Sequence, residues 1–118
     1  MATKLEWFPT HGLISGLTFQ FAEGHWPGEI GAGIALNWDA FDLIEPVLAS
    51  SCAEWTPMHR YGPLELSAPC LKLMVDGLQQ PDPNGREFPA QEKELRSYLA
   101  GWLTERLDAQ KIVSFLGV

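Results

Sequence analysis

Two runs of alternating apolar and polar residues near the N-terminus constrain the fold more than any other feature of this sequence. The larger apolar side chains of each run fall on one face: Leu13, Leu17, Phe19 and Phe21 in the first, and Ile30, Ala32, Ile34, Leu36 and Trp38 in the second. A period of two is typical of strands that bury one face. Because residues 23–28 between the runs hold two glycines and a proline, we predict an antiparallel hairpin over residues 13–37.

The spacing of apolar residues becomes helical after this hairpin. Apolar residues recur at intervals of three and four over residues 39–52, which predicts a helix there with Asp39 as its N-cap. Pro46 falls inside this segment, and a proline removes one backbone donor from a helix. We therefore expect either a kink at Pro46 or a helix that begins near Asp42.

Two further helices and two short strands complete the expected architecture. In chain order they are an extended piece at Leu64–Leu66, a helix over residues 68–78 capped by Ser67, a helix from Pro89 to about Asp108, and a strand over Lys111–Leu116. The apolar stripe of the longest helix is Leu95, Tyr98, Leu99, Trp102, Leu103 and Leu107, and Glu92 and Arg96 on its opposite face are spaced for an ion pair. The pattern predicts a single α+β domain over residues 1–118. We expect a small, mostly antiparallel sheet with an N-terminal hairpin and about three helices packed on one face.

Composition excludes several classes of function. The chain has 118 residues and a formal net charge of −7, and such an acidic balance disfavours binding to nucleic acid or to anionic membranes. No apolar run approaches the roughly 20 residues that cross a bilayer, and residues 1–10 lack the pattern of a signal peptide. Two cysteines are too few for a disulfide scaffold, so we expect a reducing, cytoplasmic setting.

The histidines and cysteines show no spacing typical of a metal or catalytic site. Cys52, His59 and Cys70 are 7 and 11 positions apart, and neither His11 nor His25 adds a close pair. We interpret the cysteines as buried thiols and the histidines as surface residues. The sequence predicts no metal, no cofactor and no catalytic group.

The glycines of residues 28–33 lie inside a predicted strand. A dinucleotide-binding fingerprint needs its glycines between a strand and a helix, so this function is excluded. Gly31 and Gly33 instead leave a strip almost free of side chains, where another backbone or an aromatic ring can pack. One alternative hypothesis is therefore a structural subunit that buries this face against a second copy, which leaves monomer and homodimer both open. Gly101 in the last helix similarly suggests a close crossing.

The excess of acids is concentrated in the first half of the chain. Residues 1–58 contain one base and seven acids. Asp39, Asp42 and Glu45 fall close together around a helix start, where they either only cap the helix or attract a basic partner. We predict that these three carboxylates contribute to binding a protein with a basic surface.

The five tryptophans suggest a second part of such an interface. Trp38 and Trp102 fall on apolar faces and are predicted to lie in the core, whereas Trp26 and Trp55 fall in predicted loops. Loop tryptophans either cover the core or, where exposed, anchor protein interfaces. On the second interpretation, an exposed cluster is formed by Trp55, Met58, Arg60 and Tyr61, with Trp26 as a further contact.

The overall plan resembles that of small bacterial immunity proteins, which neutralise secreted antibacterial toxins inside the producing cell and its kin. The similar features are the size, the acidity, the N-terminal hairpin, and the unit Leu95-x3-Leu99-x2-Trp102-Leu103 followed by Lys111-Ile112-Val113-Ser114-Phe115. The resemblance implies a non-enzymatic inhibitor that binds a toxin protein, and it transfers no binding residues. A different hypothesis is a small enzyme or small-molecule-binding domain, with a pocket between sheet and helices lined by His25, Trp26 and His59.

Overall fold

Within the described residues, the fold consists of a five-stranded antiparallel sheet and three α-helices. The computed structural model describes residues 5–12, 18–25 and 28–117. The strands are β1 (Trp7–His11), β2 (Phe19–Gly24), β3 (Ile30–Leu36), β4 (Leu64–Leu66) and β5 (Val113–Leu116), and they lie in the order β1-β3-β2-β5-β4. Every neighbouring pair is antiparallel. The fold is therefore α+β, as the sequence predicts.

The predicted hairpin is present as β2 and β3. Phe21 lies opposite Ile34, which puts their side chains on the same buried face. The first part of the predicted strand, residues 13–17, lies outside the described residues. The sequence analysis missed β1, which pairs with the other side of β3 and places Pro9 opposite Ile34. A proline inside a short run conceals a strand, because it is tolerated only at a sheet edge, and β1 is such an edge.

The first helix, α1 (Trp38–Ser51), begins earlier than one of the two predicted starts and has a different cap. The N-cap is Asn37, whose side-chain oxygen accepts a hydrogen bond from the Ala40 N–H at 2.9 Å. Asp39 therefore lies inside the first turn, and its prediction as the cap was wrong. Pro46 lies within the helix, which neither begins near Asp42 nor stops at the proline.

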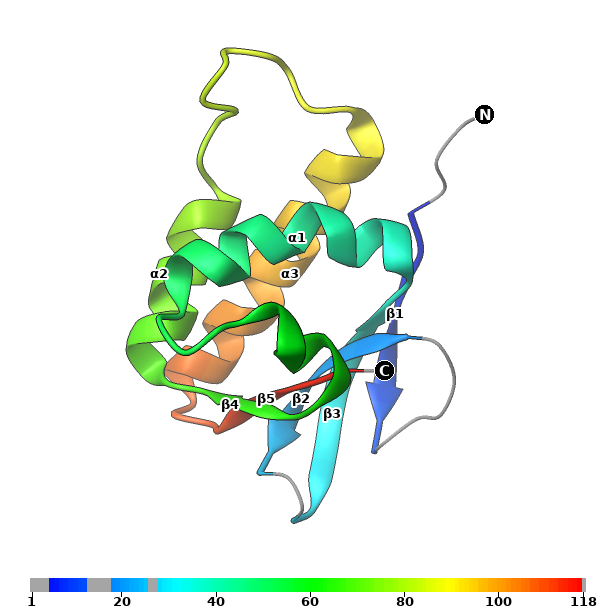
Figure 1. The fold of residues 1–118 in the computed structure, drawn as a ribbon, viewed down its shortest axis with the longest axis vertical. Coiled ribbons are helices and arrows are strands. Elements are labelled where there is room, and N and C mark those ends of the chain that lie inside the picture. The colour runs from blue at the N-terminus through cyan, green and yellow to red at the C-terminus, as the bar shows by residue number, and fades with distance from the viewer. Residues whose placement is uncertain (1–4, 13–17, 26–27, 118) are drawn as a thin grey trace.

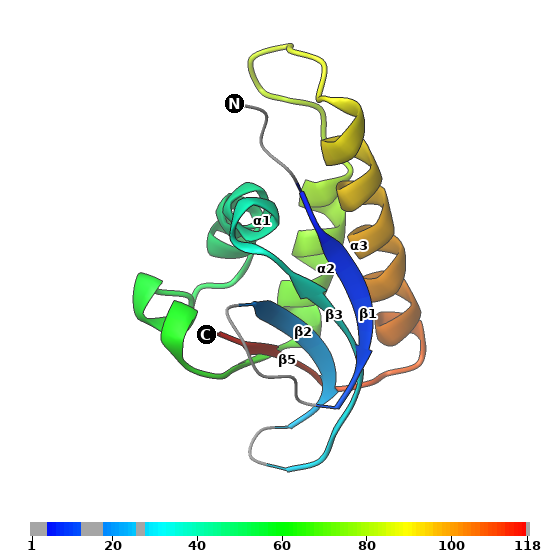
Figure 2. The ribbon, with the colours of Figure 1, turned by 90° about the vertical axis from the view of Figure 1, so that its right-hand side faces the viewer.

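The other two helices form an antiparallel pair. They are α2 (Ala68–Leu78) and α3 (Ala90–Asp108), close to the predicted ranges, and the Ser67 hydroxyl caps α2 by accepting from the Cys70 N–H at 3.3 Å. Figures 1 and 2 show α1 running across the direction of this pair, and Figure 1 shows the loop 79–89 projecting beyond it. None of the helices in the described ranges is both long enough and apolar enough to cross a bilayer.

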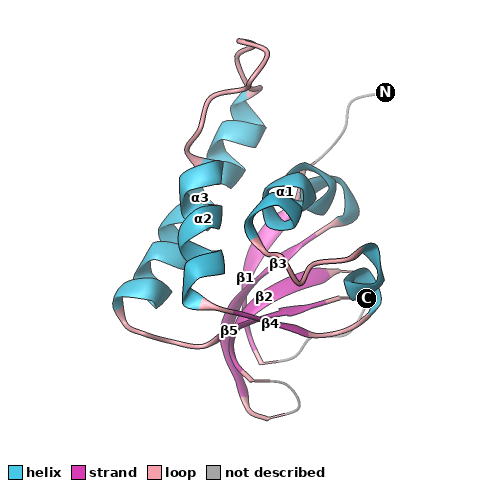
Figure 3. Cartoon of the chain, turned by 60° about the vertical axis from the view of Figure 1, so that its left-hand side comes forward, coloured by secondary structure: helices cyan, strands magenta, loops and turns pink. Residues whose placement is uncertain are grey.

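The core lies between the helices and one face of the sheet (Figure 3). Its aromatic centre is built by Phe19, Phe41 and Phe115, and the Phe19 and Phe41 rings stack with centroids 4.1 Å apart. Aliphatic side chains from each helix surround these rings: Ile44 and Leu48 from α1, Leu71 and Met74 from α2, and Leu95, Leu99 and Leu103 from α3. Burying this apolar area supplies the main driving force for folding.

Three side chains differ from their predicted burial. Trp38 is exposed because β3 ends at Leu36 and Trp38 begins α1, so the strand alternation that predicted its burial does not reach it. Tyr98 on α3 is exposed as well. Glu92 and Arg96 form the predicted ion pair at 3.0 Å, but Glu92 is buried rather than on a solvated face. The spacing of four residues therefore correctly predicted the ion pair, but the prediction that Glu92 lies on a solvent-exposed face of the helix was wrong.

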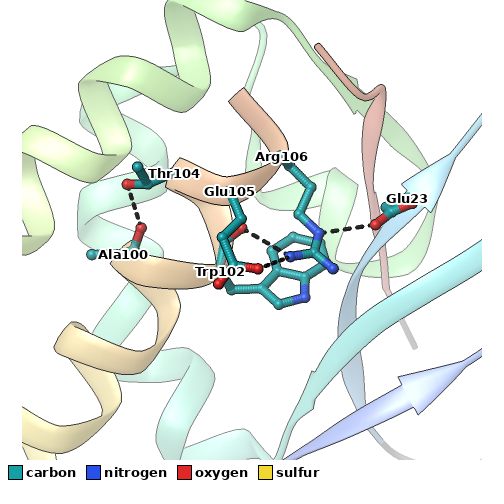
Figure 4. A network of polar contacts seen from close by, with 6 residues as sticks. All are labelled: Glu23, Ala100, Trp102, Thr104, Glu105 and Arg106. Atoms are coloured by element: carbon teal, nitrogen blue, oxygen red, sulfur yellow. Dashed lines mark hydrogen bonds and ion pairs between the residues drawn. The ribbon is translucent and has the colours of Figure 1, made fainter. Parts of the chain in front are cut away.

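Trp102 is half-buried and serves as a platform for Arg106 (Figure 4). The Arg106 guanidinium lies 4.2 Å from the centroid of the Trp102 ring, and Nε donates to Glu23 at 3.0 Å. Nη1 also pairs with Glu105 at 3.1 Å. This network ties the last turn of α3 to the end of β2.

The two cysteines are not free thiols. Cys52 and Cys70 form a disulfide, with their Cα atoms 5.0 Å apart, and both residues are buried. The interpretation of both residues as free thiols was wrong, because packing of α1 against α2 brings together positions 18 residues apart in sequence. Cys52 ends α1 as its C-cap, and Cys70 lies in the first turn of α2.

Gly33, one of the two glycines of the predicted strip on β3, is closely covered by the chain itself. A side chain at Gly33 would lie 2.5 Å from the Phe21 carbonyl oxygen and 2.9 Å from the Thr10 hydroxyl. Gln20 reaches across to the same hydroxyl, with its Nε2 donating at 2.9 Å. The predicted close approach at Gly33 therefore occurs within one chain. Gly101 makes no close crossing, since nothing lies within 4 Å of where its Cβ would be.

Candidate functional site

A short 3-10 helix, η1 (Pro57–Tyr61), carries the cluster that the sequence analysis singled out. The turn starts at Thr56, whose N–H donates to the His59 Nδ1 at 3.0 Å, while the His59 N–H donates back to the Thr56 carbonyl at 2.9 Å. A proline at the first position suits the start of such a turn. Figures 2 and 3 show η1 protruding on the side of the molecule away from α2 and α3.

Two large side chains of η1 point into solvent. Met58 is 76% exposed and Tyr61 is 66% exposed, above every other large hydrophobic residue in the described ranges. Met and Tyr side chains of this size are normally at least partly covered in a monomer. Their joint exposure on one turn makes η1 the strongest candidate contact surface of the described residues.

Trp55 holds the start of this turn in the core. Its side chain is 9% exposed and packs edge-on against Phe115, with centroids 5.2 Å apart, and near Phe41 at 6.1 Å. The interpretation of Trp55 as an exposed anchor is therefore wrong, and the alternative of a loop tryptophan that covers the core holds. Trp26, the other loop tryptophan, lies outside the described residues.

Arg60 holds the opposite end of the turn against α1. Its Nε donates to Glu45 Oε2 at 2.9 Å, its Nη2 donates to Glu45 Oε1, and the same Nη2 lies 3.7 Å from Asp42. The guanidinium also lies over the Phe41 ring, 5.9 Å from its centroid. The hydrogen bonds that Arg60 donates to the Glu45 carboxylate raise the pKa of Arg60 above its ordinary value, so this side chain stays charged at any physiological pH.

The predicted acidic triad is thus divided by the structure. Glu45 is mostly buried in a bidentate pair, whereas Asp42 is exposed beside it and Asp39 is exposed one turn earlier. We call Met58, Arg60, Tyr61, Asp42 and Glu45 the η1 surface. Glu54, which sequence reasoning passed over, is exposed just before this turn.

The C-terminal segment supports η1 from behind. A side chain at Gly117 would run into the backbone carbonyl of Arg60, so the two backbones are in close contact. Only glycine permits such an approach without displacing one of the segments. The turn is therefore held by α1, by the core and by the residue after β5.

The two histidines of the alternative pocket do not share a site. His25 pairs through Nδ1 with Glu65. The N–H of its neighbour Gly24 donates a hydrogen bond to the carbonyl of Ile112, just before β5. His59 instead lies beside Gly117, just after β5. The backbones at these two histidines therefore lie toward opposite ends of this strand.

A cavity of about 730 Å³ lies between the loop 79–89, the end of α2 and α3. Three of its lining residues are cations, and each is paired with a carboxylate: Arg86 with Asp82 at 3.0 Å, Lys93 with Glu87 at 2.5 Å, and Arg96 with Glu92 at 3.0 Å. The Asn84 N–H and Arg86 hold the pKa of Asp82 below its ordinary value. Since these charges satisfy one another, the cavity offers no concentrated charge to a ligand.

Candidate metal ligands do not converge in the described ranges. No group of three histidine, cysteine or acidic side chains there could hold a metal ion. Cys52 and Cys70 are joined to each other, which withdraws both thiolates from coordination. The arrangement on the η1 surface is instead that of a contact site.

We compared the chain with protein-family models, curated proteins and solved structures, and none of them matches. The candidate site therefore stands on its own exposure, contacts and charge.

Proposed function

We propose that this chain is a non-enzymatic protein-binding module that docks on a protein partner through the η1 surface. The specific form of the proposal is an immunity-type inhibitor that binds and neutralises a toxin protein. The observation that carries it is the exposure of Met58 and Tyr61 on a turn that is fixed at both ends.

The fixed turn favours binding because little order has to be created on association. Immobilising a loop and its side chains on binding costs free energy, and a preformed contact surface avoids most of that cost. Tyrosine supplies a large contact area with few rotatable bonds, and methionine adapts to an irregular partner. The η1 surface therefore has the composition of an interface centre with a charged margin.

Charge indicates the chemistry of the partner. Arg60 is the only base of the η1 surface, and Glu45 already neutralises it. The nearby exposed carboxylates of Asp39, Asp42 and Glu54 leave a net negative margin. Opposite charge on a partner would accelerate association, so a protein with a basic surface fits this margin better than nucleic acid or an anionic membrane does.

The structure also bears on the cellular compartment and on whether the chain is a monomer. The Cys52–Cys70 disulfide weighs against the expected reducing cytoplasm, because such bonds persist mainly in oxidising compartments. Thr10 packs over Gly33 within one chain and removes the main argument for a self-associating glycine face. A monomer that meets its partner through η1 is the simplest form of the proposal.

A capture experiment with matched variants tests it. The wild-type chain is used as bait in a lysate of its source, next to a Met58→Ala/Tyr61→Ala variant and a Leu73→Ala/Ile112→Ala variant. Leu73 and Ile112 are also exposed, at 52% and 51%, but lie elsewhere on the surface. We expect a protein that the wild type and the control pair retain and the η1 variant loses. If no protein depends on Met58 and Tyr61, the η1 surface is not the binding site.

The captured protein then tests the electrostatic and inhibitory parts. Replacing Asp39 and Asp42 by asparagine keeps the shape of both side chains and removes their charge. Association with the purified partner should therefore slow by up to about tenfold at low salt, and the difference should shrink as the salt concentration is raised. Expressing the partner alone should arrest growth, and co-expressing this chain should restore it. A partner that is harmless when expressed alone would leave protein binding standing and reject the immunity role.

A further inference from the structure

We propose that the Cys52–Cys70 disulfide is a redox-sensitive clamp on the η1 surface. In this proposal the oxidised chain presents η1 in its fixed form, and reduction by a dithiol loosens the turn. The inference rests on the proposed function, since it assigns a regulation to the same surface. Its test is independent of any partner.

The position of the bond is the first argument. Cys52 is the C-cap of α1 and Cys70 lies in the first turn of α2. The covalent ring therefore contains the complete connector between the two helices, residues 53–67, which carries η1 and β4. The Cα separation of 5.0 Å lies within the usual range for disulfides. The ends of the connector are therefore tied together at the base of the turn that carries Met58 and Tyr61.

The connector joins the sheet only through a short strand at its edge. Its strand, β4, has three residues and lies at the edge of the sheet. The other contacts that hold the connector are Trp55 in the core, the Arg60–Glu45 pair, the close backbone contact between Arg60 and Gly117, and the His25–Glu65 pair at β4. The last turn of α1 carries no basic residue to stabilise its carboxyl end. Without the disulfide, this turn and the first turn of α2 can fray apart, which lengthens the free connector and favours its open states.

The chemistry of release is thiol–disulfide exchange with a dithiol. A thiolate of the dithiol attacks one protein sulfur, so that a mixed disulfide forms and the other cysteine leaves as a thiolate and takes up a proton. The second thiolate of the dithiol then displaces the remaining cysteine. The protein bond gains two electrons and two protons, and the dithiol is oxidised to its own disulfide. Because Cys52 and Cys70 are buried, at 2% and 4% exposure, attack requires local opening of the clamp.

Amide hydrogen exchange read by mass spectrometry tests the clamp. The full chain is measured after air oxidation and after treatment with dithiothreitol, with the thiol content verified by alkylation. We expect exchange in residues 53–66 to become about tenfold faster on reduction, while α3 and the β2–β3 hairpin change little. A Cys52→Ala/Cys70→Ala variant should match the reduced chain with or without dithiothreitol.

Three results would overturn the clamp: free thiols in the air-oxidised chain, unchanged exchange in residues 53–66 after verified reduction, or equal acceleration throughout the chain. The wild-type measurement with and without dithiothreitol decides the matter even if the double variant fails to fold. A negative result for the clamp would leave the proposal of capture through Met58 and Tyr61 standing. Conversely, a chain that captures no partner can still show the redox-dependent exchange.

Discussion

The connector between α1 and α2 (residues 53–67) and the loop between α2 and α3 (residues 79–89) both carry charged side chains, but their ion pairs are arranged differently. In the connector, Arg60 binds Glu45 of a different element, and the apolar Met58 and Tyr61 remain in solvent. In the loop, Asp82 and Arg86 pair with each other, and the one aromatic side chain of the loop is partly covered.

That covered side chain is Phe88, which lies under the Arg96 guanidinium at 4.1 Å from the ring centroid. Two charged side chains of the loop thus pair within the loop. In the connector, the Arg60–Glu45 pair instead fixes a turn on which Met58 and Tyr61 stay exposed. The difference shows that charge and cavity volume alone do not locate a contact surface. The direction in which the apolar side chains are held is more informative.

The largest expected effect comes from removing the anchor of the connector. Trp55→Ala should destabilise the chain by about 3–5 kcal/mol, because it empties a site packed against Phe41 and Phe115. Urea denaturation followed by circular dichroism measures the free energy of unfolding. Tyr61→Ala is the matched control, and as an exposed residue it should change that free energy by about 0.5 kcal/mol or less. Equal effects of the two substitutions would contradict the assignment of Trp55 to the core.

The ion pair that fixes the far end of η1 comes next. Arg60→Ala should cost about 1–2 kcal/mol, since it leaves the mostly buried Glu45 carboxylate without its bidentate partner. Arg60→Lys keeps the charge but loses the two parallel donors of the guanidinium, so its free energy of unfolding should lie between those of the wild type and Arg60→Ala. The same denaturation assay measures both. A neutral Arg60→Ala substitution would mean that the pair does not hold the turn.

A glycine beside the loop should give a smaller effect of the opposite sign. Gly101→Ala should stabilise the chain by about 0.5–1 kcal/mol, because nothing lies within 4 Å of the added Cβ on α3. Gly33→Ala is the contrasting control and should destabilise, since its Cβ would meet the Phe21 carbonyl. Melting temperatures compare the two. A destabilised Gly101→Ala variant would reveal a close contact at that face of α3.

The smallest expected effect is the acid response of the loop. Asn84 and Arg86 lower the pKa of Asp82, so the ionised form favours the folded loop. This stabilisation is complete above the ordinary carboxyl value and is lost as the pH falls through the lowered pKa. The Asn84 amide resonance, followed by NMR into the acid range, should therefore shift in a step that Asp82→Asn abolishes and Asp76→Asn preserves. A step that survives in Asp82→Asn would assign the titration to another group.

The sequence was most successful where local chemistry decides the structure. The range of α2, its Ser67 cap, the β2–β3 hairpin and the Glu92–Arg96 spacing follow from capping, period and turn residues within a few positions of one another. These signals are carried by neighbours in the chain. The Met58 and Tyr61 cluster was also found, as a group of large side chains in a connector without regular period.

What the sequence by itself determined is therefore the α+β class, most helix bounds and the location of the candidate cluster. Only the tertiary structure decided that Trp55 is buried, that Arg60 pairs with Glu45 at 15 positions' separation, and that Cys52 bonds Cys70 at 18. Each of these depends on how α1 packs against the connector and α2. Such contacts join segments whose relative placement is set by the burial of the whole core, and no local sequence pattern encodes this placement.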